Sequence, residues 1–348
     1  MAVNGGLKWG KSGRSLRKRT MKIFVTRKIP GSALARLFSS DHEVNVSEFD
    51  RPITSDELLA MAKGTDALLC LLTDKIDGEV MDAIGPQLKL IANYAVGFDN
   101  IQVDEATARG ILVTNTPSDV INESVSEFAW TLILALAKRV VEADESTRRG
   151  AYKGWEPATF MGVNMGGKTL GIVGLGRIGS MTAKRAVGWN MRVLYNKRSR
   201  DPEVEKELGI EFADLDKLYA QSDFISIHVP LTDETRHMVN KGAFDKMKKG
   251  VVVVNTARGP IIDEMDLVSA IRDGKVGGAG LDVFDNEPNI NPELVAMENV
   301  ILTPHIASAT VEAREEYGNL AVDAILDALS GKKPQNLVDD KVWENRRK

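Results

Sequence analysis

Short apolar runs alternate with helical patterns along most of the chain, beginning just after Met21. In the first third, five apolar runs predict strands at residues 23–26, 44–46, 67–72, 88–92 and 111–114. The helical patterns between them include residues 55–62 and 77–84. Strands that alternate with helices predict right-handed crossovers and a mostly parallel sheet. This unit is expected to end near Thr116 and Pro117, because proline breaks regular elements.

A long amphipathic helix is predicted next. Its apolar stripe recurs at helical spacing through Val125, Phe128, Ala129, Leu132, Ile133, Leu136, Ala137 and Val140. About 25 helical residues would span roughly 37 Å, which is long enough to connect two domains. The irregular stretch 150–167 follows and contains Trp155 and Phe160. Exposed aromatic side chains there favour an arm that contacts a second subunit, and a solvated loop is the alternative.

A second alternation of strands and helices begins at Lys168. Strands are predicted at residues 169–173, 192–195, 224–228, 251–255, 278–283 and 300–303, and a last helix at 311–329. Six strands with intervening helices match a doubly wound dinucleotide-binding fold. The predicted fold class is therefore α/β, with two doubly wound parallel-sheet domains. A Rossmann cofactor domain (121–308) is inserted into a flavodoxin-like substrate domain (21–120 plus 309–335), and 336–348 form a tail.

Composition narrows the possible functions. The 348 residues carry a net charge of −4, which argues against general affinity for nucleic acid. The longest strongly apolar run, 128–137, is shorter than the roughly 20 residues of a membrane span. Cys70 is the single cysteine, so an intramolecular disulfide is excluded. Residues 1–20 hold six basic residues and no acid, and they are predicted to be a disordered leader. No signal-peptide-like apolar segment follows them, so we expect a cytoplasmic protein.

A glycine-rich loop lies between a predicted strand and a predicted helix. It reads Gly174-Leu175-Gly176-Arg177-Ile178-Gly179. A G-x-G-x-x-G motif in that context binds the pyrophosphate of a dinucleotide at the amino end of the helix. The loop therefore predicts a nicotinamide dinucleotide as cofactor.

The end of the next predicted strand indicates which dinucleotide is used. An acid about 20 residues after the glycine loop would bind the ribose 2′-hydroxyl of NAD. Here Lys197, Arg198 and Ser199 occupy that position, with Asp201 just beyond. Cations and a hydroxyl suit the 2′-phosphate of NADP, so NADP(H) is preferred and NAD(H) remains possible. A solvated basic turn is the alternative interpretation.

Chemically active side chains follow three successive strands of the second unit. Arg258 follows the strand 251–255, Asp282 and Glu287 follow the next, and His305 follows the last. Ligands of open α/β sheets bind at such carboxyl ends. A cation, carboxylates and a histidine beside a dinucleotide loop therefore predict an active site. No metal site is predicted. His228 is interpreted as structural, or as lining an adenine pocket.

These motifs resemble the D-isomer-specific 2-hydroxyacid dehydrogenase family, over nearly all of 21–338. The resemblance rests on the glycine loop, on Asn255–Gly259, on Leu281–Phe284 with Glu287-Pro288, and on Thr303–Ile306. The run from Asn93 to Ile101 is most similar to glyoxylate/hydroxypyruvate reductases. Other branches of the family, of D-lactate or phosphoglycerate type or a dinucleotide-sensing corepressor, are the alternatives.

The resemblance implies a role for each candidate residue. Arg258 would bind the substrate carboxylate together with the backbone amides of Val96 and Gly97. His305 would protonate the ketone, and Glu287 would orient the imidazole ring of His305. The predicted cofactor contacts are Asp282 with the nicotinamide amide, and Val229, Pro230, Thr256, Ala257, His305 and Ala307 along the site. The expected activity is NADPH-dependent reduction of glyoxylate or hydroxypyruvate to the D-2-hydroxyacid, by a homodimer joined through the arm.

Overall fold

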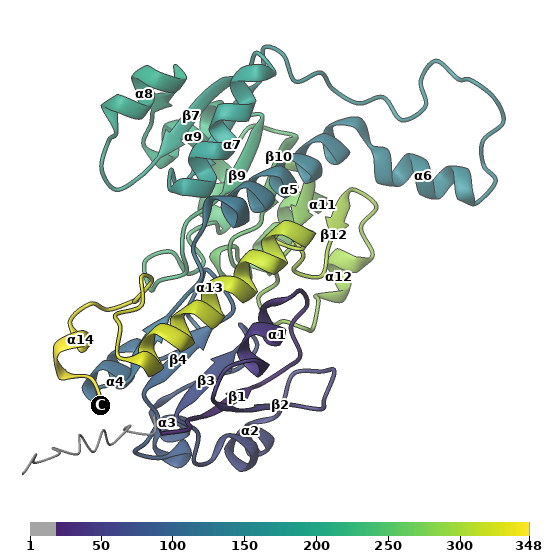
Figure 1. Ribbon diagram of the computed structural model, residues 1–348. Coiled ribbons are helices and arrows are strands. Elements are labelled where there is room, and N and C mark those ends of the chain that lie inside the picture. The colour runs from purple at the N-terminus through teal and green to yellow at the C-terminus, as the bar shows by residue number, and fades with distance from the viewer. Residues whose placement is uncertain (1–18, 348) are drawn as a thin grey trace, which may run out of the picture.

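The computed structural model describes residues 19–347 and contains two parallel sheets (Figure 1). The predicted leader lies outside the described residues except for its last two positions. The first sheet has the order β2-β1-β3-β4-β5 and the second the order β12-β11-β10-β9-β6-β7-β8. Every strand pair in both sheets is parallel. These are the strand orders of the flavodoxin-like and Rossmann arrangements, the second extended by one strand.

The first sheet and its helices form the lower half of the molecule in Figure 1. Its strands are β1 (Lys22–Val25), β2 (Glu43–Val46), β3 (Ala67–Cys70), β4 (Leu90–Asn93) and β5 (Leu112–Thr114). Its helices are α1 (Ala33–Phe38), α2 (Ser55–Ala62), α3 (Gly78–Ile84) and α4 (Val103–Ala108). The central strands β3 and β4 are buried along their whole length, as expected of a sheet covered on both faces.

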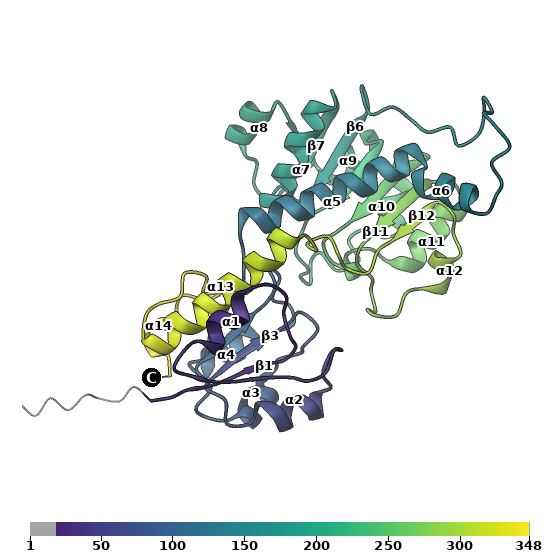
Figure 2. The same cartoon turned by 45° about the vertical axis from the view of Figure 1, so that its right-hand side comes forward.

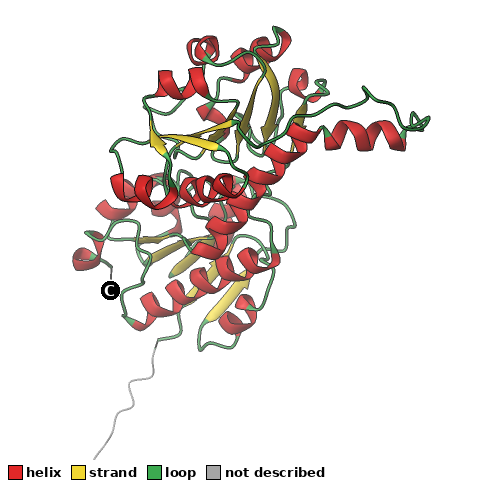
Figure 3. Cartoon of the chain, turned by 90° about the horizontal axis from the view of Figure 1, so that it is seen from above, coloured by secondary structure: helices red, strands yellow, loops and turns green. Residues whose placement is uncertain are grey.

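The second sheet forms the upper half. Its strands are β6 (Thr169–Val173), β7 (Arg192–Asn196), β8 (Glu211–Phe212), β9 (Phe224–Ile227), β10 (Val251–Asn255), β11 (Val276–Leu281) and β12 (Val300–Leu302). Its helices are α7 (Arg177–Gly188), α8 (Pro202–Leu208), α9 (Leu215–Gln221), α10 (Lys241–Lys246), η1 (Gly259–Ile261), α11 (Glu264–Arg272) and α12 (Pro292–Val295). Figure 3 shows the helices on both sides of the strands.

Two 20-residue helices pass between the halves and lie side by side in Figures 1 and 2. Helix α5 (Asp119–Lys138) packs on α7, β10 and β11, whereas α13 (Val311–Ser330) returns and packs on α1 and β4. Among the described residues, α5 is the one helix long and apolar enough to cross a membrane, and over half of that stretch is buried in the protein. A buried core helix passes the same test.

The predicted 25-residue helix is shorter than expected. It stops at Arg139, which adopts a left-handed conformation with φ 53°, and α6 (Val140–Arg148) then starts in a new direction. The apolar stripe continues through Val140 and no glycine or proline marks the break, so the sequence pattern could not locate it. Helix α6 buries none of its residues and leads into the arm, which projects away from both halves (Figure 1).

The segment predicted as a tail packs on the first sheet. Leu337 forms an antiparallel bridge with Thr114 of the edge strand β5, and the Val338 amide donates to the Val113 carbonyl at 2.9 Å. After α14 (Val342–Asn345), the Arg347 guanidinium donates to three backbone carbonyls of this half. The segment therefore covers a sheet edge that would otherwise be exposed.

Candidate active site

The glycine loop joins β6 to α7 in the centre of the second sheet. Gly174 has φ 100°, and a Cβ there would lie 2.8 Å from the backbone of His228 and Val229. A Cβ at Gly179 would overlap the Gly174 carbonyl, so only glycine lets the helix approach the strand this closely. A Cβ at Gly176 would meet no atom within 4 Å, and no side chain caps α7 there. Open space beside an uncapped helix start fits the pyrophosphate of a dinucleotide.

The basic tip lies beside this loop at the end of β7. The Gly174 amide donates to the Asn196 carbonyl at 3.0 Å, and residues 197–199 follow directly after Asn196. Lys197 pairs with Asp201 at 3.1 Å, and the Asp201 carboxylate also caps α8, so this acid faces its own helix. Arg198 and Ser199 are exposed. In the part of the chain that the structure describes, Arg198 has no ion-pair partner, so its guanidinium is available to a phosphate.

A cavity of about 400 Å³ lies between the carboxyl ends of the two sheets. The predicted site residues that line it are Val96, Gly97, Ile178, Val229, Pro230, Thr256, Ala257, Arg258, His305 and Ala307. A neighbouring cavity of about 760 Å³ contains Glu287 and shares Leu72 and His305 with the first. The topology thus brings the substrate and acid–base candidates together with several cofactor candidates, whereas the basic tip and the glycine-loop residues other than Ile178 line neither cavity.

His305 and Glu287 form a hydrogen-bonded pair. The distance between His305 Nδ1 and Glu287 Oε2 is 2.9 Å, and the Phe284 amide donates to Glu287 Oε1 at 3.0 Å. Burial alone would raise the pKa of Glu287, but the hydrogen bond and charge of His305 outweigh it and lower that pKa. Glu287 is therefore a carboxylate near neutral pH. Because Nδ1 is engaged, Nε2 is the ring nitrogen left to act on a bound substrate.

The backbone of His305 is held by a buried carboxylate. His305 has φ 54°, a left-handed conformation that non-glycine residues rarely adopt. The Asp282 carboxylate accepts hydrogen bonds from the Thr303 hydroxyl at 2.6 Å and from the Ile306 and Ala307 amides, both at 2.8 Å. Asp282 is fully buried beneath this turn and lines neither cavity. The structure thus gives it the task of fixing the turn, and its predicted contact with a nicotinamide amide stays a prediction.

The loop after β4 presents two backbone amides to the cavity. Asn115 donates to the Val96 carbonyl at 2.7 Å, and Asn93 donates to the Gly97 carbonyl at 2.9 Å. Asn100 links Asn93 to the carbonyls of the neighbouring loop. Within residues 19–347, neither the Val96 nor the Gly97 amide donates to a protein atom. Two adjacent free amides form a concave site that suits a carboxylate.

Arg258 stands opposite these amides on the second sheet. Asn255 fixes its loop, since the amide group of Asn255 donates to the Arg258 carbonyl at 2.8 Å and its Oδ1 accepts from the Ala257 amide at 3.0 Å. The guanidinium pairs with Asp99 at 2.9 Å. No sequence motif pointed to a role for Asp99, although it lies two residues after Gly97.

The other histidines contribute no acid–base chemistry here. His228 lies in the cavity wall, where Nε2 contacts the Ser226 hydroxyl at 2.9 Å. Burial lowers the pKa of His228 to about 4, so the ring is neutral at physiological pH. His237 and His42 lie outside both cavities.

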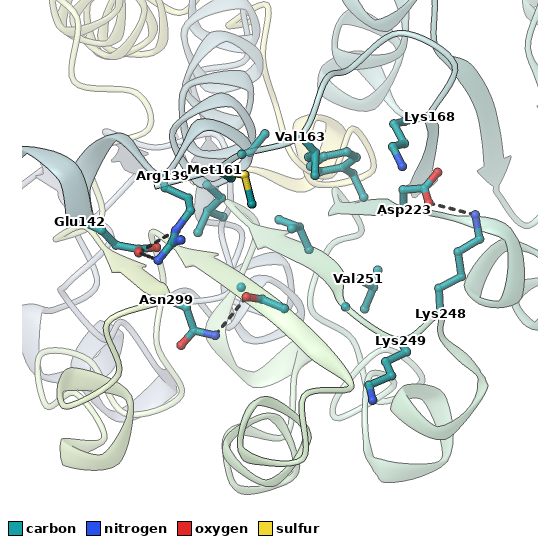
Figure 4. A pocket seen from close by; sticks show the side chains of 18 residues that line it. Arg139, Glu142, Met161, Val163, Lys168, Asp223, Lys248, Lys249, Val251 and Asn299 are labelled. Carbon is teal, nitrogen blue, oxygen red and sulfur yellow. Dashed lines mark hydrogen bonds and ion pairs between the residues drawn. The ribbon is translucent and has the colours of Figure 1, made fainter. Parts of the chain in front are cut away.

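A further cavity of about 370 Å³ lies at the opposite edge of the second sheet (Figure 4). Its wall includes the amino ends of β9 and β10 and the end of the arm. Its acids are paired: Asp223 with Lys248 at 3.0 Å, and Glu142 with Arg139. The amino ends of the strands face away from the residues described above, so this cavity takes no part in the candidate active site.

The arm is only partly as predicted. Trp155 is 84% exposed and Met161 70% exposed, whereas Phe160 is half-buried with the Arg139 guanidinium 5.4 Å from its ring. Residues 150–167 form no helix or strand. The arm returns to the body where the Val163 amide donates to the Ala137 carbonyl at 2.8 Å. The most exposed large apolar side chains of the arm are thus Tyr152, Trp155 and Met161.

Comparisons with known proteins identify relatives of the chain. Residues 130–307 match the model of the D-isomer specific 2-hydroxyacid dehydrogenase NAD binding domain. The chain is 47% identical to the glyoxylate reductase of Thermococcus kodakarensis over 94% of this chain and 98% of that protein. The glyoxylate reductase structure from Paecilomyes thermophila has a TM-score of 0.82 at 31% identity, covering 92% of this chain and 99% of that one.

A second solved structure was determined with cofactor. It is the NADPH-dependent glyoxylate/hydroxypyruvate reductase of Sinorhizobium meliloti in complex with NADP and malonate. It has a TM-score of 0.81 at 32% identity and covers 95% of this chain and 99% of that chain.

Proposed function

The chain belongs to the D-isomer specific 2-hydroxyacid dehydrogenase family, and we propose that it reduces glyoxylate or hydroxypyruvate with NADPH to the D-2-hydroxyacid. Family membership makes it an NAD(P)-dependent oxidoreductase that acts on a CH–OH group. The observation that carries the proposal is the His305–Glu287 pair, because the His305 ring of this pair lines the cavity that also contains Arg258 and the loop with two free amides. That set matches a small molecule with a carboxylate next to a ketone.

Each residue then has a defined task in the reaction. Arg258 and the neighbouring amides of Val96 and Gly97 bind the substrate carboxylate together. The reduced nicotinamide supplies the hydride when it is bound. His305 Nε2 donates the proton to the ketone oxygen, and the Glu287 carboxylate stabilises the imidazolium before transfer and holds the ring in place afterwards. Several residues around the cavity are apolar, which limits access of water to the reacting carbon.

The proposal is tested by initial rates with a panel of 2-ketoacids and both reduced cofactors. We expect glyoxylate and hydroxypyruvate with NADPH to give the highest kcat/KM. Pyruvate or phosphohydroxypyruvate as the best substrate would favour the D-lactate or phosphoglycerate type. Tight dinucleotide binding without turnover of any 2-ketoacid would instead favour a dinucleotide-sensing protein.

The preference for NADPH is assigned to the exposed basic tip. Arg198→Ala should weaken NADPH binding by about 1.5–3 kcal/mol, since Arg198 would lose a charge-assisted hydrogen bond to the 2′-phosphate, and NADH much less. Fluorescence titration with both cofactors measures this. Lys206→Ala is the matched control, because it removes the same charge from the exposed face of the neighbouring helix α8. Equal losses for the two cofactors would refute the assignment.

We propose that the active form is a homodimer joined through the arm. The exposed Trp155 and Met161 and the unburied helix α6 support this, because apolar surface of this extent usually packs against a partner. Sedimentation should give a dimer at micromolar concentration, and Trp155→Ser should raise its dissociation constant about tenfold or more. Val295→Ser, at an equally apolar exposed site on α12, is the control. A wild-type monomer at that concentration would contradict the proposal.

A further inference from the structure

Asp99 makes the one ion pair of Arg258 within residues 19–347. It lies in the loop between β4 and α4, on the first sheet, whereas Arg258 follows β10 on the second. Asp99 Oδ1 accepts from Arg258 Nε at 3.0 Å and lies 2.9 Å from Nη2. The pair therefore connects the two halves of the molecule at the proposed carboxylate site.

The hydrogen bonds of Arg258 leave a particular edge of its guanidinium free. Asp99 occupies the edge formed by Nε and Nη2, and Nη1 donates to the Ala257 carbonyl at 2.8 Å. A guanidinium has five N–H donors, so one N–H of Nη1 and one of Nη2 remain along the outer edge. Two parallel N–H groups are the geometry that binds a carboxylate with both oxygens.

Gly97 fixes where that outer edge lies. A Cβ at Gly97 would overlap Arg258 Nη2, so the guanidinium packs directly against this glycine. The unpaired amides of Val96 and Gly97 belong to the same loop as Asp99. One loop thus supplies two amide donors for an anion and the acid that orients the third donor.

We propose that Asp99 is a positioning residue, which holds Arg258 so that its free edge and the amides of Val96 and Gly97 form one carboxylate site. The inference deepens the proposed function and rests on it. A substrate carboxylate and Asp99 use different edges of the guanidinium, so both are bound at once. Burial alone would raise the pKa of Asp99, but the hydrogen bond and charge of Arg258 outweigh it, and Asp99 is ionised at neutral pH.

Kinetics of Asp99 variants provide the test. Without its partner, the long Arg258 side chain samples several rotamers, and ordering it costs free energy at each binding event. Asp99→Ala should therefore raise the KM for glyoxylate, and the dissociation constant of oxamate in the NADPH complex, about tenfold or more. Asp99→Asn keeps an acceptor oxygen and should stay within about threefold of wild type. NADPH affinity should not change in either variant.

The controls separate positioning from other roles. Asp104→Ala removes the same charge from an exposed site on α4 and should leave the KM unchanged. In an Arg258→Ala background, Asp99→Ala should cost almost nothing further in kcat/KM, because the residue acts only through Arg258. An additive loss there would overturn the inference. A lower KM in Asp99→Ala would also overturn it, since Asp99 would then compete with the substrate.

Failure of this inference differs from failure of the proposed function. A wild-type protein that reduces no 2-ketoacid would refute the function. Oxamate binding would then still report whether Asp99 and Arg258 act together. A wild-type protein that reduces glyoxylate, with an additive Asp99 effect, would refute the inference alone.

Discussion

Replacing His305 with glutamine should lower kcat for ketoacid reduction by about 10²–10⁴, the usual contribution of a positioned acid–base group. Glutamine keeps a polar side chain within reach of Glu287 but has no proton to donate at neutral pH. Binding of NADPH should change less than twofold, because the glycine loop and the basic tip, which we propose bind the pyrophosphate and the 2′-phosphate, are untouched. Stopped-flow measurement of NADPH oxidation at saturating substrate gives the rate, and fluorescence titration gives the affinity.

The control for this variant is His42→Gln, which makes the same substitution at a residue that lines neither cavity. It should keep wild-type kcat. A His305→Gln enzyme with more than a tenth of the wild-type kcat would show that the proton comes from another group, such as a water molecule.

Gly97→Ala should lower kcat/KM for glyoxylate by about 10² or more. The new methyl group would occupy the place of Arg258 Nη2, and the guanidinium would have to leave both Asp99 and the free amides. Losing two charge-assisted hydrogen bonds to the substrate corresponds to about 3 kcal/mol or more. The Asn93 and Asn115 contacts that hold the loop use backbone carbonyls, so the melting temperature should change little.

Steady-state kinetics and thermal unfolding of the same preparation test this prediction. Gly188→Ala is the control, since a Cβ there meets no atom within 4 Å. It should retain full activity. Wild-type kcat/KM in Gly97→Ala would mean that Arg258 can bind substrate from another position, and the proposed carboxylate site would be wrong.

The sequence predicted the strands well because buried parallel strands are continuous apolar runs. β6 and β10 have the predicted bounds, and α2 begins and ends as predicted, with Thr54 and Glu57 forming a capping box. β8 was missed because two residues, Glu211 and Phe212, carry no periodicity. The seven-stranded sheet therefore exceeds the six strands expected.

The candidate site shows a similar limit. Strand ends located Arg258, Glu287 and His305, because parallel topology gathers such ends at one edge. The strand ends could not locate Asp99, because its partner Arg258 is 159 residues away and follows a strand of the other sheet. The strand ends alone do not separate the buried Asp282 from Glu287, since both are acids that follow β11, and only the family resemblance gave them different roles. These roles depend on tertiary contacts between segments that local patterns do not relate.

The pH dependence of kcat in wild type and in Glu287→Gln tests most directly whether the His305–Glu287 pair is the acid. Reduction needs the imidazolium, so its rate should fall as pH rises. Oxidation of the hydroxyacid needs the neutral imidazole, so its rate should rise with pH. The lowered pKa of Glu287 means that its carboxylate is charged near neutral pH and above, where these rates are measured. Glutamine removes the charge that favours the imidazolium, so the fall in the reduction rate should occur at lower pH. If the reduction rate falls at the same pH in wild type and in Glu287→Gln, the account is contradicted.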